Sequence, residues 1–241
     1  MQHMLQPNLA LLTARSNKSP DPDHFFISNK PSETKAAEST IQSYSFPLFA
    51  YVDERDPIEN LSSEFREYLD SRYEHHYTPE ETLGYIYALL HAPSYRARYA
   101  EFLRIDFPRI PFPEEASEFE ALSRSGWALV QAHLLRDLPR RGLAKYHGKG
   151  DNTVEAARYS PQEQAIAINK TQSFKPVPED VWNFHIGGYQ VLDKYLKSRK
   201  GRKLTLDEID HVPAVADSLA FTIDQMAKID EAYQAAFAER G

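Results

Sequence analysis

The chain has 241 residues, enough for one large domain or two small ones, and 41% of them are hydrophobic, as in globular proteins. It has no cysteine, so disulfides and thiolate metal sites are excluded. It also has neither an apolar run of about 18 residues, which a transmembrane helix needs, nor the features of a signal peptide at its start. We therefore expect a cytoplasmic protein without a membrane partner.

The net charge of −7 is unevenly distributed along the sequence. Between Arg140 and Lys203 there are 13 Lys and Arg against 6 Asp and Glu, whereas the remainder has 15 against 29. A basic segment within an acidic chain is typical of a surface that faces phosphates. The alternative is that these charges fold onto different faces and form no common surface.

Residues 1–57 are expected to form a β segment. Runs of aliphatic and aromatic residues predict strands at 8–15, 24–30 and 43–52, separated by loop-forming stretches. The polar sequence DERDP at 53–57 then ends the β region, because it is typical of a turn.

Residues 58–140 are expected to form a helical block. Apolar residues at helical spacing predict a first helix from Ile58 to about Tyr73. Thr78 and Glu81 are spaced as a capping box, which predicts a second helix that ends before Pro93. Residues 94–103 are expected to form a short helix, 105–113 an extended proline-rich arm, and 114–135 a long helix.

Residues 141–241 are expected to form a hairpin followed by helices. Residues 153–169 predict two short strands with a turn at Tyr159, Ser160 and Pro161. A helix that ends at Gly201 is expected next, and Thr205 with Glu208 predicts the start of another. The last thirty residues have the pattern of one amphipathic helix. The order of these elements predicts an α+β fold, with the three segments forming one compact unit.

The motifs of common enzymes are absent from the sequence. There is no phosphate-binding GxxxxGK[ST] loop, no GxGxxG, no HExxH and no GxSxG. His75 and His76 are adjacent, and neighbours in a helix point about 100° apart, so they are not a metal-chelating pair. We expect no catalytic residue, no metal and no cofactor in this chain.

Two polar loops are candidates for binding nucleic acid. Glycine lets a backbone approach a ligand closely, and Asn, Gln and Lys side chains suit base edges and phosphates. The alternative is that both are ordinary surface loops. The candidate residues in KYHGKGDNT are Lys145, His147, Lys149 and Asn152, and those in INKTQSFK are Asn169, Lys170, Thr171 and Gln172.

The densest cluster of positive charge follows the second of these loops, near the end of a predicted helix. Part of this charge complements the helix dipole, and contact with phosphates is the functional interpretation. The cluster consists of Lys197, Arg199, Lys200, Arg202 and Lys203.

Two long stretches carry a resemblance to a known family. They are YIYALLHAPSYRARYAEFLRIDFPRIPFP, followed by LVQAHLL, and VWNFHIGGYQVLDKYLKSRKGR, followed by LTLDEI. They resemble the C-terminal specificity region of Type ISP restriction–modification enzymes. In these enzymes one polypeptide joins a nuclease, a helicase-like ATPase, an adenine methyltransferase and a target-recognition domain. The resemblance covers roughly residues 5 to 235.

The resemblance implies a non-catalytic domain that recognises double-stranded DNA. The parent would methylate adenine at N6 with S-adenosylmethionine and use ATP for restriction, and its methyltransferase domain would be the partner at residues 1–57. The adenine-holding NPPY-like motif is absent here. The assignment of base reading to the two loops rests on their position and chemistry rather than on a motif. The alternative is a protein-interaction module that docks methyltransferase or helicase domains.

Overall fold

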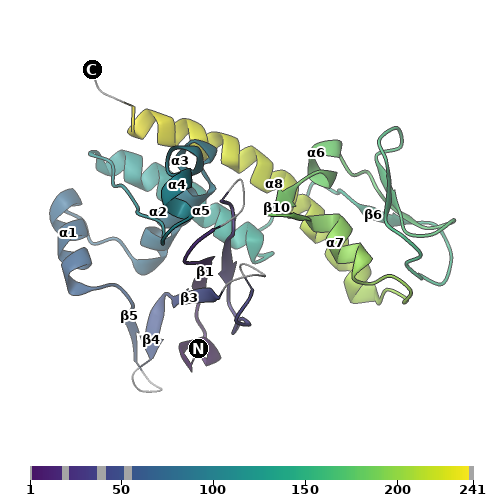
Figure 1. Ribbon diagram of the computed structural model, residues 1–241, viewed down its shortest axis with the longest axis horizontal. Helices are drawn as coiled ribbons and strands as arrows, with labels where there is room; N and C mark the ends of the chain where they lie inside the picture. The colour runs from purple at the N-terminus through teal and green to yellow at the C-terminus, as the bar shows by residue number, and fades with distance from the viewer. Residues whose placement is uncertain (1, 18–21, 37–41, 52–55, 239–241) are drawn as a thin grey trace. The chain divides into compact units, whose positions relative to one another are not determined.

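A computed structural model describes residues 2–17, 22–36, 42–51 and 56–238. The chain divides into two compact units, Met1–Leu134 with Gln225–Gly241, and Leu135–Asp224. The boundary after Leu134 lies close to the one expected at 140, and the one expected at 57 lies inside the first unit. Both units contain helices and strands, so the predicted α+β class is confirmed (Figure 1).

The first unit begins with a small antiparallel sheet. Strand β1 (Ala10–Ala14) lies between β2 (Phe25–Ser28) and β3 (Ser43–Pro47). A 3-10 helix precedes it at Gln2–Leu5, and the separate pair β4 (Phe49–Tyr51) and β5 (Pro57–Glu59) follows it. The first two predicted strands are present, whereas the strand predicted at 43–52 is divided into β3 and β4, which belong to separate sheets. The β region also continues to β5, beyond its predicted end at 53–57. Residues 53–55 of the predicted turn, and parts of the two loops before it, lie outside the described residues.

The predicted start of the first helix at Ile58 is wrong. Ile58 pairs with Ala50 in the β4–β5 ladder, and α1 runs from Ser63 to Tyr73. The hydroxyl of Ser62 accepts a hydrogen bond from the amide of Phe65 at 3.2 Å, so the helix begins at this cap. The spacing of apolar residues placed the start of the helix too early, because the spacing within one segment does not show that Ile58 pairs with the preceding strand.

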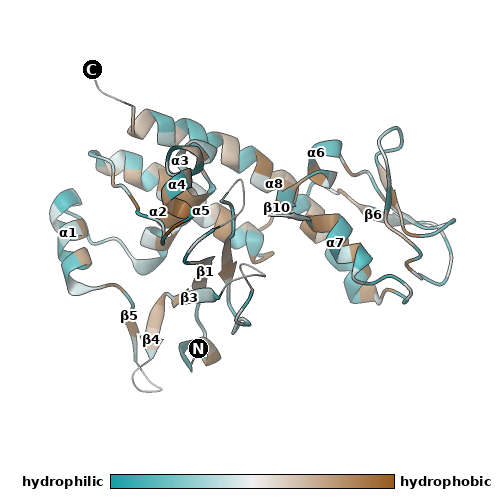
Figure 2. Cartoon of the chain, in the orientation of Figure 1, coloured by the Kyte–Doolittle hydropathy of each residue, from teal (hydrophilic) through white to brown (hydrophobic). Residues whose placement is uncertain are grey.

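Two long helices form the core of the first unit. Helix α2 (Pro79–His91) crosses α5 (Ala116–His133) where Gly84 faces Gly126. A Cβ added to Gly126 would collide with the carbonyl oxygen of Gly84 and lie 2.7 Å from the amide nitrogen of Ala88. Apolar residues concentrate on α2 and β1, whereas α1 is mostly hydrophilic (Figure 2). The predicted helix over 94–103 is split into α3 (Pro93–Arg98) and α4 (Ala100–Leu103).

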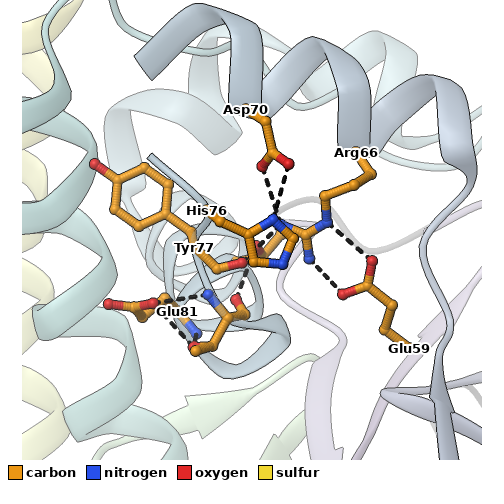
Figure 3. Close-up of polar contacts among 8 residues, drawn as sticks. Glu59, Arg66, Asp70, His76, Tyr77 and Glu81 are labelled. Carbon is orange, nitrogen blue, oxygen red and sulfur yellow. Dashed lines mark hydrogen bonds and ion pairs between the residues drawn. The ribbon is translucent and has the colours of Figure 1, made fainter. Parts of the chain in front are cut away.

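An ion-pair cluster joins α1 to the start of α2 (Figure 3). The guanidinium of Arg66 contacts Glu59 at 2.5 Å and Asp70 at 3.5 Å, and donates to the carbonyl of Tyr77 at 2.6 Å. The predicted capping box of α2 is present, since the Thr78 amide donates to Glu81 at 2.8 Å and the Glu81 amide donates back at 3.2 Å.

The two adjacent histidines make separate contacts. His76 pairs with Asp70 at 2.8 Å, whereas the ring of His75 packs on Tyr77, with ring centroids 4.5 Å apart. Across the described ranges, no group of three His, Cys, Asp or Glu is placed to hold a metal ion.

The proline-rich arm after α4 is held by side-chain donors. Prolines cannot donate a backbone hydrogen bond, so the arm joins no sheet. The hydroxyls of Tyr95, Tyr85 and Tyr73 instead donate to the carbonyls of Arg109, Pro111 and Pro113, at 2.8, 2.5 and 2.8 Å.

The second unit contains a four-stranded antiparallel sheet, ordered β6 (Lys145–His147), β9 (Ser173–Lys175), β8 (Ala165–Ala167) and β7 (Arg158–Ser160). The predicted turn at Tyr159–Pro161 is displaced, because Tyr159 and Ser160 pair with Ile166 and Ala165 and the chain reverses over 161–164. One side of the sheet packs on the helices around a core that includes Ile166, Phe174, Leu192, Leu196 and Val212.

The remaining elements of the second unit are α6 (Glu179–Trp182), the hairpin β10–β11 (His185–Ile186 and Tyr189–Gln190), α7 (Val191–Lys197) and α8 (Leu206–Ala236). Helix α7 ends at Lys197, earlier than the predicted Gly201. The predicted capping box precedes α8, since the Glu208 amide donates to Thr205 Oγ1 at 3.2 Å. The helix continues through Pro213 into the first unit. None of the described helices is long and apolar enough to cross a bilayer.

The close contact of α2 and α5 at Gly84 and Gly126 predicts that adding one methyl group there lowers the stability of the fold. Gly126→Ala should lower the free energy of unfolding by about 3 kcal/mol, because the colliding atoms are backbone and the helices must separate. Urea denaturation measures this change. Arg124→Ala on the same helix removes only an exposed pair with Glu120 at 3.6 Å and should change stability by less than about 0.5 kcal/mol. Equal effects of the two variants would contradict the packing argument.

Two histidines, the buried His91 and the half-buried His133, predict a loss of stability in acid. Burial lowers the pKa of His133 to about 4 and that of His91 well below 6.5. The folded state therefore binds fewer protons, so stability is complete above about pH 6.5 and declines as the pH falls toward 4. Between pH 7.5 and 5, His133 alone should account for about 2 kcal/mol.

His133→Asn tests this pH dependence, since an amide can occupy the position of Nδ1, which lies 2.7 Å from the hydroxyl of Tyr87. Urea unfolding at the two pH values should show a flatter dependence in this variant. His147→Asn, at an exposed position, should keep the steeper dependence of the unmodified chain. An unchanged slope in His133→Asn would refute the assignment.

Candidate nucleic-acid interface

Three segments that are far apart in sequence meet beside β6 in the second unit. The pairing of His147 with Ser173 places the loop 148–152 beside the loop 169–172. The amide of Val154 donates to the carbonyl of Arg202 at 3.0 Å, and the amide of Leu204 donates to the carbonyl of Asn152 at 2.9 Å. The two candidate loops and the basic cluster are therefore parts of one region.

A buried amide network joins the two loops. The side chain of Gln172 is only 2% exposed. Its Oε1 accepts from the amide of Asn152 at 3.0 Å and from Nδ2 of Asn169 at 2.9 Å, and its Nε2 donates to Asn152 Oδ1 at 2.8 Å. The hydroxyl of Tyr146 also donates to Asn152 Oδ1, at 2.9 Å. These polar groups satisfy one another, as buried polar groups must.

The second amide of the network shapes its own loop. Oδ1 of Asn169 accepts from the backbone amides of Thr171 and Gln172, at 3.0 and 2.8 Å, while its Nδ2 also donates to the carbonyl of Thr153 at 2.9 Å. Asn152, Asn169 and Gln172 were predicted as DNA contacts. The structure instead places them where they hold the loops together, and their direct contact with DNA stays a prediction.

Glycines allow the two loops to approach each other. Gly148 has φ of +98°, and a Cβ there would collide with the carbonyl oxygen of Thr171. A Cβ on Gly150 would lie 2.5 Å from Oε1 of Gln172. The glycines of KYHGKGDNT thus bring this backbone close to another loop, which is a different role from the predicted close approach to a ligand.

The two arginines of the basic cluster share one carboxylate. Arg199 and Arg202 contact Glu208 at 2.9 and 2.5 Å, and these hydrogen bonds, with that of the Thr205 amide, lower the pKa of Glu208 to about 2. The guanidinium of Arg199 also lies 3.5 Å from the ring centroid of Tyr195. Arg199 is therefore fixed, while the three charges leave one net positive charge beside the loops.

The lysines of the cluster are more available. Lys197 pairs with Asp193 at 2.7 Å and Lys203 with Asp151 at 3.7 Å, with the lysine side chains 65% and 68% exposed. Exposed pairs contribute little stability, so a phosphate can compete for these ammonium groups. Lys200 is also exposed.

The other predicted residues lie exposed around the amide network. Lys145 and His147 share one face of the sheet, opposite to Tyr146, because side chains alternate along a strand. The exposed predicted residues beside the network are Lys145, His147, Lys149, Lys170 and Thr171.

One further basic residue, Lys175, was not predicted from the sequence. It lies directly opposite Lys145 across the β6–β9 pair, and both are exposed. Like charges directly opposite one another destabilise a sheet, and a bound anion would offset this repulsion. The sequence contained a signal, since β6 and β9 each place an aromatic residue next to an exposed basic one, but only the register brings the two lysines together.

These observations define an α+β domain with a basic, loop-built edge. Its family follows from comparison with known proteins. Residues 1–228 match the family model of the Type ISP C-terminal specificity domain, and the chain belongs to that family. The resemblance noted from the sequence is therefore confirmed. No curated protein matches the sequence.

Solved structures of similar fold include the ATP-dependent Type ISP restriction-modification enzyme LlaBIII bound to DNA, at 14% identity and a TM-score of 0.72 over 94% of this chain. The DrdV–DNA complex matches at 18% identity and a TM-score of 0.71 over 93%. A nuclease-deletion mutant of the Type ISP enzyme LlaGI, in complex with a DNA substrate mimic, matches at 18% and 0.65 over 94%. This chain spans 16%, 24% and 18% of those chains, respectively.

The close approach of the two loops predicts a local effect of one substitution. Gly148→Ala should lower the free energy of unfolding by about 2 kcal/mol, because alanine disfavours positive φ and its methyl group would collide with the carbonyl oxygen of Thr171. Amide hydrogen exchange should accelerate in residues 149–153 and 170–172. Gly188→Ala is the matched control, since a Cβ there meets nothing within 4 Å. Unchanged exchange in Gly148→Ala would show that the loops are not held by this approach.

Proposed function

We propose that this chain is the DNA sequence-recognition part of a restriction–modification enzyme that methylates adenine N6 in duplex DNA. The observation that carries the proposal is the convergence of two polar loops and a basic cluster at one edge of the second unit. Membership of the specificity-domain family supports it, as do the similar folds in enzymes solved with DNA.

The charge distribution between the units supports the same assignment. Each unit has 14 Lys and Arg, whereas Asp and Glu number 23 in the first unit and 12 in the second. The acidic excess thus lies in the first unit, and phosphates are attracted to the second. Exposed lysines would contact the phosphates of the DNA backbone and so set the position of the domain along the duplex. The loops would contact base edges, which carry the sequence information.

The proposed chain binds DNA without performing chemistry. In the parent enzyme, S-adenosylmethionine would supply the methyl group and ATP would drive restriction, both outside this chain. Its place would be the cytoplasm, with the DNA. The phosphate-facing groups of the proposal are Lys145, Lys149, Lys170, Lys175, Lys197, Lys200, Arg202 and Lys203.

A second role is favoured by an apolar surface on the first unit. The half-exposed rings of Tyr44 and Phe46 lie edge-on to Phe107, with centroids 5.1 and 5.4 Å away. Beside them is a pocket of about 340 Å³ lined mainly by apolar side chains, including Leu83 and Ile110. As the alternative to DNA recognition, this surface would dock the methyltransferase domain of the parent enzyme.

Removing two exposed lysines tests DNA binding. Lys149→Ala/Lys200→Ala should weaken binding to every duplex, and the slope of log K against log salt should fall by about 0.9 for each phosphate that is no longer neutralised. Lys30→Ala/Lys228→Ala makes the same change of charge at exposed positions of the first unit and should leave the slope unchanged. Fluorescence anisotropy over a salt series measures both.

The unmodified chain should first be incubated with a random duplex pool at low salt, and the recovered DNA sequenced. Enrichment of one short motif would establish base-specific recognition. A complex that is insensitive to salt would contradict the proposal. Failure to recover DNA, with the lysine variants still able to bind a methyltransferase domain, would favour the docking role, because an apolar surface does not depend on these charges.

A further inference from the structure

The buried side chain of Gln172 joins the two candidate loops, and it lies beside their exposed residues. Its neighbours Lys170 and Thr171 face solvent, whereas Gln172 itself is buried and uses both ends of its amide. The Gln172 clasp, as we call the hydrogen-bonded set Tyr146, Asn152, Asn169 and Gln172, is therefore a candidate device for setting the position of these exposed residues.

The clasp restrains both loops at several points. Asn152 adopts a left-handed conformation with φ of +65°, and its backbone amide and side chain both bond to the Gln172 amide. Asn169 fixes the backbone of Thr171 through Oδ1 and reaches across to the carbonyl of Thr153. Each loop is thus tied to the other by hydrogen bonds that neither can form alone.

The clasp is also distinct from the charges that attract DNA. Its four members are neutral, and the nearby ion pair between Lys203 and Asp151 is exposed. Replacing a neutral clasp residue with a neutral apolar one therefore changes loop position without changing the electrostatic attraction to phosphate. Positioning and attraction are separable in this site.

We propose that Gln172 is a positioning residue for sequence discrimination, in place of the direct DNA contact expected from the sequence: it holds the loops 148–152 and 169–172 in the arrangement that reads base edges. The proposal rests on the proposed function of DNA recognition. Hydrogen bonds to base edges are directional, so rigid side chains discriminate better than mobile ones. Loosening the clasp should therefore reduce discrimination while leaving attraction to phosphates intact.

The central test is Gln172→Met in the full chain, which keeps the side-chain length and the charge but removes the amide. Binding is measured to the duplex enriched from the random pool and to a scrambled duplex. The Kd for the scrambled duplex divided by the Kd for the enriched duplex should fall by about tenfold, which is the discrimination typical of one side chain bonded to a base edge. The Kd for the scrambled duplex and its salt slope should remain those of the unmodified chain. Gln162→Met, at an exposed turn, is the matched control and should change neither.

A milder variant tests the same proposal if Gln172→Met does not fold. Tyr146→Phe removes one hydroxyl that donates to Asn152 and retains the ring contact with Phe174, whose centroid is 5.1 Å away. It should reduce the ratio by a smaller factor. Hydrogen exchange in residues 149–153 and 169–172 should accelerate in both variants, independently of any DNA.

The outcomes separate this proposal from the one on which it rests. If the unmodified chain enriches a motif but the ratio is unchanged in a folded Gln172→Met, the positioning role is refuted and DNA recognition stands. A proportional weakening on both duplexes would also refute it, since Gln172 would then serve the phosphate-binding surface or the fold alone. If the unmodified chain recovers DNA without enrichment of a motif, these loops do not discriminate by themselves, and the positioning role is refuted. If the chain recovers no DNA, the proposed function fails as well.

Discussion

The hydrogen-bonding requirement of one buried primary amide organises the candidate interface. Gln172 is removed from water, and its amide must find a donor and an acceptor within the protein. Asn152 and Asn169 provide them from two different loops, and residues 152–154 in turn pair with 202–204. Through this series of hydrogen bonds, satisfying a single side chain brings together all three segments that carry the exposed basic residues.

Two helix starts were predictable because their signals are local. The capping boxes Thr78–Glu81 and Thr205–Glu208 are both present, since the partners lie three residues apart and need nothing else from the fold. Strand pairing, in contrast, depends on residues outside the segment whose pattern is read. Ile58 continues the apolar spacing of α1, yet it pairs with Ala50 in a strand, and no pattern within 58–73 contains that information.

The composition of the site was predictable, but the roles of its individual residues were not. Lysine and amide residues marked both loops, and glycines marked the first. Adjacent residues nevertheless differ, with Thr171 exposed and Gln172 buried, because the neighbouring loop covers one and not the other. Likewise, Arg199 belongs to the densest basic run, but it is engaged by Glu208 and Tyr195. Lys175 was not predicted because only the strand register sets it opposite Lys145.

If the chain recognises DNA as proposed, this arrangement would separate attraction to phosphates from discrimination among sequences. Several cations at the edge already have carboxylate partners, so much of the local charge is neutralised before DNA arrives. Phosphate attraction, which falls steeply with salt, is therefore limited in a chain of net charge −7. The neutral hydrogen bonds that join the loops are far less sensitive to salt, because they involve no full charges. Under the proposed function, a domain built this way would contribute less to affinity than to the choice among sequences, which would depend on where its side chains are held.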